Sequence, residues 1–232
     1  MKIAVLSDIH GNHIALQKVL TEINQTDIKK IFIAGDFIGY YFWPREVLSM
    51  IQGLDVFAIK GNHEEMFFSI INQKACLADI SKKYGSGMEE ALNNLDKNQI
   101  RWLKDLPVSN NCVIDGKKIS IFHGSPWDPN FYVYPNSNES IIMRCFQEEA
   151  DLIILGHTHI QMELIRKNKK ILNPGSVGQP RDGRVGAQWA TVDLDTLKVK
   201  FMCTEYDNSL IKHEVYSRHK DMKILTKSLY EK

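Results

Sequence analysis

The sequence predicts an α/β protein built as a four-layer α-β-β-α sandwich, in which helices flank two mixed β-sheets. Its first half alternates strand-like apolar runs with helical segments, which is typical of βαβ units and a parallel sheet. Its second half is rich in hairpins. The chain has 232 residues and no Ser-, Gly- or Pro-rich linker or internal repeat, so a single domain over 1–232 is expected.

In the first half, strands and helices follow from hydrophobic spacing. Leu16, Val19 and Ile23 fall on one helical stripe behind a candidate cap, Asn12, and Pro44 opens a second helix. The chain from about 64 to 104 is expected to be mostly helical, with a break near "YGSG". Strands are expected at 2–7, 29–36 and 54–61, and the first two helices at 12–23 and 44–52.

In the second half, polar turns separate short apolar runs. A hairpin at 108–124 turns at Asp115-Gly116, a dipeptide that favours tight hairpin turns. Further elements are expected as a helix at 137–150, a strand at 151–157, hairpins at 160–175 and 187–203, and a C-terminal helical extension at about 207–232.

Composition excludes several classes of partner. Lys plus Arg is 29 and Asp plus Glu is 28, a formal net charge of +1, so there is no strong signal for a nucleic-acid partner. No apolar run approaches the roughly 18 residues of a membrane-spanning helix. The 4 cysteines show no C-x-x-C pattern and are expected to be buried thiols in a reducing compartment, so we expect a cytoplasmic protein without a membrane partner.

Residues of metal-ligand type recur where apolar runs end. In open α/β sheets, ligands bind beyond the carboxyl ends of the strands, so five such ends are expected to meet at one edge. Glycines beside these residues permit tight turns. The residues concerned are Asp8, His10, Asp36, Asn62, His63, His123, His157 and His159.

The chemistry of these side chains suits two divalent ions. Imidazole and carboxylate together favour Mn, Fe, Co, Ni or Zn. Residues spaced i and i+2 at a strand end point the same way, which would let His157 and His159 serve one cluster. A carboxylate such as Asp36 can bridge two ions, and such a pair can polarise a phosphoryl oxygen and lower the pKa of a shared water.

Each residue taken alone has an ordinary structural explanation. Asp8 alone is as well explained as a helix cap, and Asp36 as a turn residue. A lone His123 is more often a core histidine with satisfied hydrogen bonds. Agreement among five strand ends, in a chain with only 8 histidines, favours the metal site.

The ordered set of motifs resembles the calcineurin-like metallophosphoesterase superfamily. The matching pieces are "DIHGN", "GD" at Gly35-Asp36, "GNHE", "HGSP" and "GHTH", and "NPGSVGQPRDG" is similar to the branch of small, single-domain bacterial members. The resemblance covers most of the chain. It implies the calcineurin-like phosphoesterase fold, a sandwich of two mixed sheets flanked by helices.

The resemblance also implies a ligand assignment and a mechanism. Asp8, His10, Asp36 and His159 would hold one ion. Asp36, Asn62, His123 and His157 would hold the other, with Asp36 as the bridge. Mn²⁺ is the ion expected first, with Fe, Zn, Ni or Co as alternatives. The family's nucleophile is a metal-bridging hydroxide, and His63 would bind the substrate phosphate and act as general acid.

The roles of two charged residues near these motifs stay open. Glu64 either orients His63 or simply begins the next helix. Arg181 either binds the substrate phosphate or pairs with Asp182 or Asp151.

Two aromatic loops depart from the family pattern. Tyr41, Phe42 and Trp43 follow "GD", and a second loop at 127–134 carries Trp127, Phe131, Tyr132 and Tyr134. Such side chains either stack on a nucleobase or pack against one another, and packing is favoured.

The expected activity is hydrolysis of a small phosphomonoester or phosphodiester. The alternatives are hydrolysis of a nucleotide (a dinucleoside polyphosphate or cyclic nucleotide), or of a phosphoprotein. A non-catalytic scaffold would be expected to lack part of the ligand set, and none of it is missing here. The sequence predicts nothing about the oligomeric state.

Overall fold

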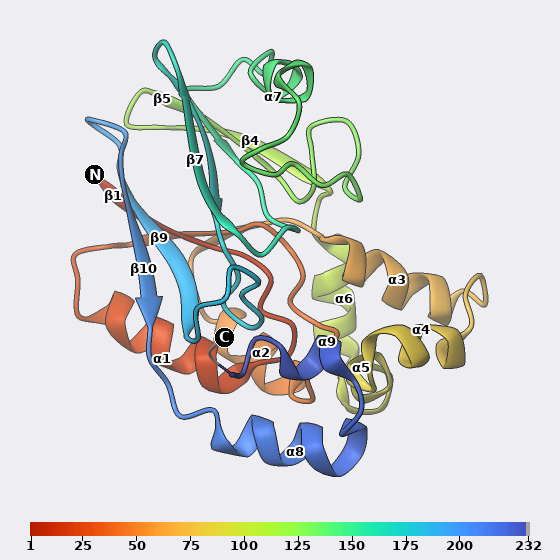
Figure 1. Ribbon diagram of the computed structural model, residues 1–232. Helices are drawn as coiled ribbons and strands as arrows, with labels where there is room; N and C mark the ends of the chain where they lie inside the picture. The colour runs from red at the N-terminus through yellow and green to blue at the C-terminus, as the bar shows by residue number, and fades with distance from the viewer. Residues whose placement is uncertain (231–232) are drawn as a thin grey trace.

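Two five-stranded sheets lie face to face in the computed structural model, which describes residues 1–230, and helices cover both outer sides (Figure 1). The strands are β1 (Lys2–Leu6), β2 (Lys30–Ile33), β3 (Val56–Ala58), β4 (Ser109–Ile114), β5 (Lys117–Phe122), β6 (Leu152–Ile154), β7 (Gln161–Arg166), β8 (Lys169–Pro174), β9 (Ala187–Asp193) and β10 (Lys198–Thr204). The helices are α1 (His13–Asn24), α2 (Pro44–Ile51), α3 (Asn62–Ile71), α4 (Leu77–Tyr84), α5 (Gly87–Asn94), α6 (Lys97–Asp105), α7 (Glu139–Cys145), α8 (Ser209–His219) and α9 (Lys223–Thr226).

Both sheets are mixed. The first has the order β10-β9-β1-β2-β3, and the second has the order β4-β5-β6-β8-β7. In the first sheet β1, β2 and β3 run parallel, while β9 pairs antiparallel with β1 and β10. In the second, β6 lies between two parallel neighbours and the hairpins supply the edges. The predicted four-layer class is confirmed.

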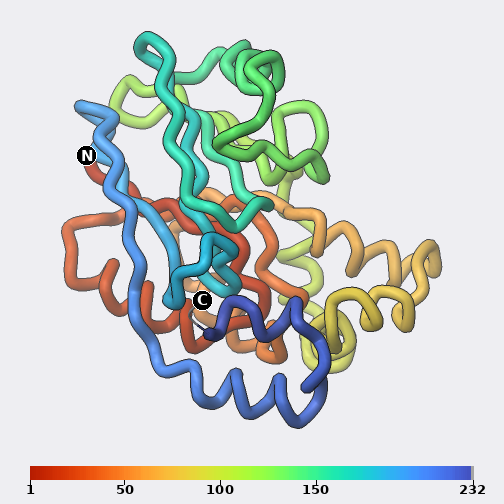
Figure 2. The backbone as a smooth tube through the Cα atoms, viewed as in Figure 1, coloured from red at the N-terminus to blue at the C-terminus, as the bar shows by residue number. Residues whose placement is uncertain are grey.

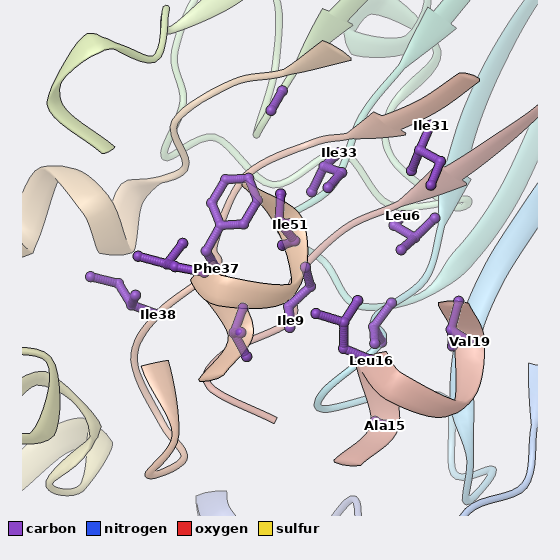
Figure 3. Packing of buried hydrophobic residues seen from close by; sticks show 14 of the residues in the cluster. Leu6, Ile9, Ala15, Leu16, Val19, Ile31, Ile33, Phe37, Ile38 and Ile51 are labelled. Carbon is purple, nitrogen blue, oxygen red and sulfur yellow. The ribbon is translucent and has the colours of Figure 1, made fainter. Parts of the chain in front are cut away.

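Strand β1 contributes side chains to two hydrophobic cores, one on each face of the first sheet. Its side chains alternate between the faces of the sheet, as a period of two requires. Ile3 and Val5 pack between the sheets, whereas Ala4 and Leu6 pack against the helices of the first sheet. Figure 3 shows Leu6 together with residues of β2, α1 and α2 in this helix-facing core.

Helix α1 follows the prediction from spacing. The side chain of Asn12 accepts a hydrogen bond from the backbone N–H of Ala15 and so caps the helix. Leu16, Val19 and Ile23 are buried on the side facing the sheet. Because β1 leads directly into this helix, the loop between them is fixed at both ends.

The third strand and the helix after it differ from the prediction. Strand β3 has 3 residues, and α3 begins at Asn62, earlier than expected. The cause is one half of a capping box: the Glu64 carboxylate accepts the backbone N–H of Gly61, which has no side chain to complete the pair. The helical region is also divided more often than the single predicted break, into α3, α4, α5 and α6.

The expectation of buried cysteines is wrong for two of the four and holds only in part for Cys112, which is half-buried. Cys145 is buried, but Cys76 and Cys203 are exposed. Cys76 precedes α4 and Cys203 lies on the edge strand β10, so neither faces a core. Over residues 1–230 we find no helix long and apolar enough to span a bilayer.

The C-terminal extension folds back onto the loop that follows β2. Helices α8 and α9 form its ordered part, and positions 231–232 of the predicted extension lie outside the described residues. Ile211, Val215 and Leu225 pack against Tyr41 and Phe42. In Figure 2 the blue C-terminal segment runs beneath the rest of the chain and then turns back toward it.

We predict that Leu16→Ala lowers the free energy of unfolding by about 2–5 kcal/mol, because it leaves a cavity between α1 and the first sheet. Urea denaturation measures this change. Lys18→Ala is the matched control, because Lys18 is exposed on the same helix and should change stability by less than about 0.5 kcal/mol. Equal effects of the two substitutions would contradict this account of the core.

Candidate metal centre

Five loops at the carboxyl ends of strands bring the predicted side chains together. The loops follow β1, β2, β3, β5 and β6, and they cross-link through backbone hydrogen bonds. Asp8 N–H donates to the Gly35 carbonyl at 3.0 Å, and Gly156 N–H donates to the His123 carbonyl at 2.7 Å. These bonds join loops within each sheet, and Gly178 N–H, after β8, donates to the Asp8 carbonyl at 3.0 Å and so joins the loops of the two sheets.

The backbone at these residues is not extended, contrary to the expectation that i and i+2 neighbours share a strand end. Five ligand-type residues have φ between 51° and 65°, the left-handed region that non-glycine residues rarely adopt. The turns direct these side chains toward the cluster, and the two-residue alternation of a strand does not. The five are Asp8, His10, Asp36, His157 and His159.

The side chains form three overlapping groups whose potential ligand atoms lie within 4.8 Å of one another. The first group is Asp8, His10 and His159, the second is Asp36, His123 and His157, and the third is His10, Asp36 and His63. His157 and His159 thus belong to different groups although they are two residues apart. Asn62 joins the second group, since its Oδ1 lies 2.9 Å from Nε2 of His123.

Hydrogen bonds to carbonyl groups fix the tautomers of three histidines. Nδ1 of His10, His123 and His159 lies 3.1, 2.6 and 2.6 Å from the carbonyl oxygens of Ile38, Ala34 and Gln179. A carbonyl only accepts, so Nδ1 carries the hydrogen and the Nε2 lone pair of a neutral ring points into the cluster. This is the usual orientation of metal-binding histidines.

The first group has features that fit a cation between its members. Nε2 of His10 and Nε2 of His159 face each other at 3.1 Å, an arrangement in which two lone pairs repel. Asp8 Oδ1 lies 3.2 Å from the same His159 nitrogen and is buried without a hydrogen-bond donor. A cation would satisfy all three atoms.

His157 is held differently. Its backbone N–H donates to Asp8 Oδ2 at 3.0 Å, and its Nε2 lies 3.2 Å from the Asn130 carbonyl. The ring of Tyr132 stacks on it at a centroid distance of 3.9 Å. Nδ1 is then the nitrogen left for an ion.

The charges of the two carboxylates depend on their neighbours. Burial opposes ionisation of Asp8 and Asp36, but imidazoles outweigh it, so the pKa of each lies below its usual range. Although burial works against a charged His123, Asp36 raises the pKa of that imidazole to about 10. A metal ligand must be neutral imidazole, so metal binding would release this proton.

The other imidazoles are held neutral. Burial is the main cause that lowers the pKa of His10 and His159, and it lowers the pKa of His157 to about 4. Ionised carboxylates and neutral imidazoles are the forms that bind divalent ions. The residues of the cluster therefore fit a dinuclear centre.

Glu64 holds the loop that carries Asp36. Its carboxylate accepts backbone N–H groups of Asp36, Phe37, Ile38 and Gly61 at 2.8 to 3.3 Å. Burial, with the charge of Asp36, raises the pKa of Glu64 to about 7. Glu64 thus caps α3 and fixes the Asp36 turn.

His63 lies against the first and third groups. Its backbone N–H donates to Asp36 Oδ1 at 2.9 Å, and its Nδ1 is buried without a partner. Its ring lies 4.7 Å from that of His10. Gly39 makes this position possible, because a Cβ there would lie 2.1 Å from the His63 ring.

Several residues that support the centre were not identified from the sequence. Ser176 Oγ donates to the Asp8 carbonyl at 2.6 Å, and Asn173 Nδ2 donates to the Gly156 carbonyl at 2.6 Å. Both belong to the "NPGSVGQPRDG" motif, whose polar residues were the available signal. Tyr40 and Tyr84, whose rings pack against His63, gave no sequence signal beyond their place beside glycines.

Arg181 does not form either of the ion pairs considered from the sequence. Asp182 pairs with Arg184, and Asp151 accepts the backbone N–H of Lys118. Nη2 of Arg181 instead donates to the Tyr40 hydroxyl at 2.9 Å, beside the cluster.

The aromatic loops mostly pack away from the centre. Tyr41 and Phe42 are covered by the C-terminal extension, and Trp43 contacts His13 at 5.0 Å between ring centroids. Trp127 packs against Phe131. Packing is therefore the better explanation of these loops, and Tyr132 is the residue of the second loop that contacts a ligand-type ring.

We predict that Glu64→Ala lowers the free energy of unfolding by about 2–5 kcal/mol and reduces metal binding, because four buried N–H groups lose their acceptor. Chemical denaturation and titration with Mn²⁺ measure the two effects.

Glu65→Ala is the control for this prediction. Glu65 is the next residue of α3 and is only partly buried, so both quantities should stay near the wild-type values. A stable, metal-binding Glu64→Ala protein would show that the Asp36 loop does not depend on this carboxylate.

Comparisons with known proteins agree with this geometry. An uncharacterized protein of Methanocaldococcus jannaschii, MJ0912, is 33% identical over 223 residues, which cover 88% of each chain. Phosphodiesterase YfcE of Escherichia coli is 23% identical over 202 residues, which cover 86% of this chain and 91% of that protein. The crystal structure of a metallophosphoesterase from Sphaerobacter thermophilus matches with a TM-score of 0.80 and 25% identity, covering 99% and 98% of the two chains.

The sequence model of the calcineurin-like phosphoesterase superfamily domain matches residues 1–197. That range contains all eight of the ligand-type residues at the strand ends. The chain belongs to the calcineurin-like phosphoesterase superfamily.

Proposed function

We propose that the protein is a dinuclear-metal-dependent phosphohydrolase acting on small phosphomonoesters or phosphodiesters. The observation that carries this proposal is the buried cluster of two carboxylates and converging imidazole nitrogens. Membership of a phosphoesterase superfamily supports the reaction class, and the name of YfcE supports ester hydrolysis among relatives.

The two ions would be shared among the residues as the resemblance implies. Asp8, His10 and His159 would hold one, His123, His157 and Asn62 would hold the other, and Asp36 would bridge them. Bound divalent ions neutralise charge on phosphoryl oxygens and lower the pKa of water. Mn²⁺ is the ion we would test first, before Fe, Zn, Ni and Co.

His63 would protonate the leaving oxygen, and Asn62 would contact the substrate phosphate beside it. Burial lowers the pKa of the His63 imidazole to about 4, so the ring is neutral near pH 7 before substrate binds. A phosphate anion beside it favours the charged form and raises that pKa. The proton is then available where the negative charge of the leaving group develops.

Two alternatives have less support. Hydrolysis of nucleotides was motivated by stacking aromatics, but Trp43 and Trp127 pack elsewhere. Phosphoprotein hydrolysis rests on "GNHE" alone. A scaffold role has no observation in its favour, because the ligand set is complete. We further propose one domain over residues 1–232 and a cytoplasmic location; the four free cysteines are compatible with a reducing compartment.

We predict that chelation by EDTA reduces hydrolysis of p-nitrophenyl phosphate to background, and that Mn²⁺, Ni²⁺ or Co²⁺ restores it. Metal analysis should give about two equivalents per chain, and Asp36→Ala should lower this number, because the shared carboxylate is lost. Asp79→Ala, an exposed carboxylate on α4, is the control. Full activity without divalent ions would refute the proposal.

We predict that His63→Ala retains its metal ions and slows hydrolysis of an alkyl ester, glycerol phosphate, by about 10²–10⁴-fold in kcat. p-Nitrophenolate leaves without a proton, so the same substitution should slow p-nitrophenyl phosphate by only about tenfold or less. His213→Ala, an exposed imidazole on α8, is the control. Equal slowing of both esters would mean that His63 does not protonate the leaving group.

A further inference from the structure

Arg181 is held at the edge of the metal centre from two sides. Its Nη2 donates to the Tyr40 hydroxyl at 2.9 Å and to Gln179 Oε1 at 3.0 Å. Its backbone N–H donates to the carbonyl of His159 at 3.0 Å. Its guanidinium lies 5.6 Å from the centre of the Tyr40 ring, and that ring is 4.5 Å from His10. Only one ring separates the arginine from the cluster.

The guanidinium keeps donors for a further partner. An arginine has five N–H donors, in a fixed fork. Among residues 1–230, its hydrogen bonds to protein run from Nη2 alone, and no salt bridge involves it. The side chain is half-buried, and its charge also acts on the Tyr132 hydroxyl, where it opposes the rise of the tyrosine pKa that burial causes. No acceptor among residues 1–230 is hydrogen-bonded to Nε or Nη1, so these N–H groups can donate to an external anion.

The position of Arg181 depends on the C-terminal extension. Gln179 is buried, and its Nε2 donates to the Ile224 carbonyl of α9 at 3.0 Å. The Tyr41 hydroxyl donates to the next carbonyl, Leu225, at 3.0 Å. One partner of the guanidinium, Gln179, is thus attached directly to α9, and the other, Tyr40, is attached through the next residue of its loop, Tyr41, which reduces the entropy lost when an anion binds.

The approach to the cluster is narrow. None of its five imidazoles is more than 5% exposed. Three tyrosines surround them: the rings of Tyr40 and Tyr84 lie 4.9 and 5.2 Å from that of His63, and Tyr132 covers His157 at 3.9 Å. A phosphate with one substituent meets fewer side chains here than a phosphate with two.

We propose that Arg181 makes the protein select phosphomonoesters over phosphodiesters. The inference rests on the proposed function. In-line displacement leaves three oxygens around phosphorus besides the leaving oxygen. In a monoester dianion all three are unsubstituted and share the charge. In a diester one of them carries the second organic group. Arg181 faces the oxygen that carries the second organic group in a diester. It binds this oxygen when the oxygen is unsubstituted and charged, as in a monoester, and it collides with the organic group when the oxygen is esterified.

The first test compares two esters on metal-loaded protein. With p-nitrophenyl phosphate, Arg181→Met should lower kcat/KM by about 10- to 100-fold, since it removes a charged hydrogen bond. With bis(p-nitrophenyl) phosphate the loss should be about threefold or less. Arg181→Lys should recover only part of the loss, because it restores the charge without the fork. Arg184→Met is the matched control, since Arg184 pairs with Asp182 and should leave both esters unchanged.

Gln179 serves as a positioning residue in the same test. Gln179→Leu should raise KM for the monoester by about 3- to 10-fold while kcat and metal content stay near wild type. A general loss of structure would instead lower kcat, metal content and diester hydrolysis together.

The second test measures binding without turnover. Calorimetry with inorganic phosphate should show about tenfold or greater weakening by Arg181→Met, while dimethyl phosphate binds equally to both proteins. Equal losses for both esters and both anions would overturn the inference. If the wild type hydrolyses neither ester, the proposed function fails. The selectivity of Arg181 still stands in that case if the wild type binds inorganic phosphate more tightly than dimethyl phosphate and Arg181→Met loses this preference.

Discussion

The burial of two carboxylates at one sheet edge is the constraint on which the rest of the site depends. Asp8 and Asp36 are almost completely inaccessible to solvent, and a buried ion without compensation costs several kcal/mol. One oxygen of each accepts a backbone N–H, from His157 and His63. The remaining oxygens face imidazoles: Asp36 Oδ2 lies 3.3 Å from Nε2 of His123, whose pKa it raises, and Asp8 Oδ1 lies 3.2 Å from Nε2 of His159. Divalent cations shared by the two carboxylates would add to this compensation.

The backbone conformation of the ligand-type residues also costs free energy. Five ligand-type residues have left-handed backbone angles, and each such residue costs on the order of 1–3 kcal/mol. Hydrogen bonds between loops offset this strain, and they come from distant parts of the chain. Ser176 holds the Asp8 turn, Asn173 holds Gly156, and Glu64 holds the Asp36 turn. The two packed sheets supply the rigid frame on which these bonds form.

Much of this arrangement could be predicted from the sequence because it depends on local signals. Apolar runs predicted the strands, and glycine beside polar residues predicted the loops where ligand-type side chains meet. The short β3, the role of Glu64 and the place of Tyr40 could not be predicted in the same way. Each depends on contacts between segments more than twenty residues apart, such as Glu64 with the Asp36 loop. Hydrophobic period and turn composition carry no information about such contacts.

The C-terminal extension connects a part of the chain outside the family match to the rim of the cluster. The family match ends at residue 197, before α8 and α9. Helix α9 nevertheless holds Gln179, which accepts a hydrogen bond from Arg181, and Tyr41, which follows the second acceptor, Tyr40. The rim also contacts the cluster directly, because the Gln179 carbonyl accepts Nδ1–H of His159. In the proposed function, the reaction type would depend on the cluster, and the choice of substrate would depend on the rim that holds Arg181.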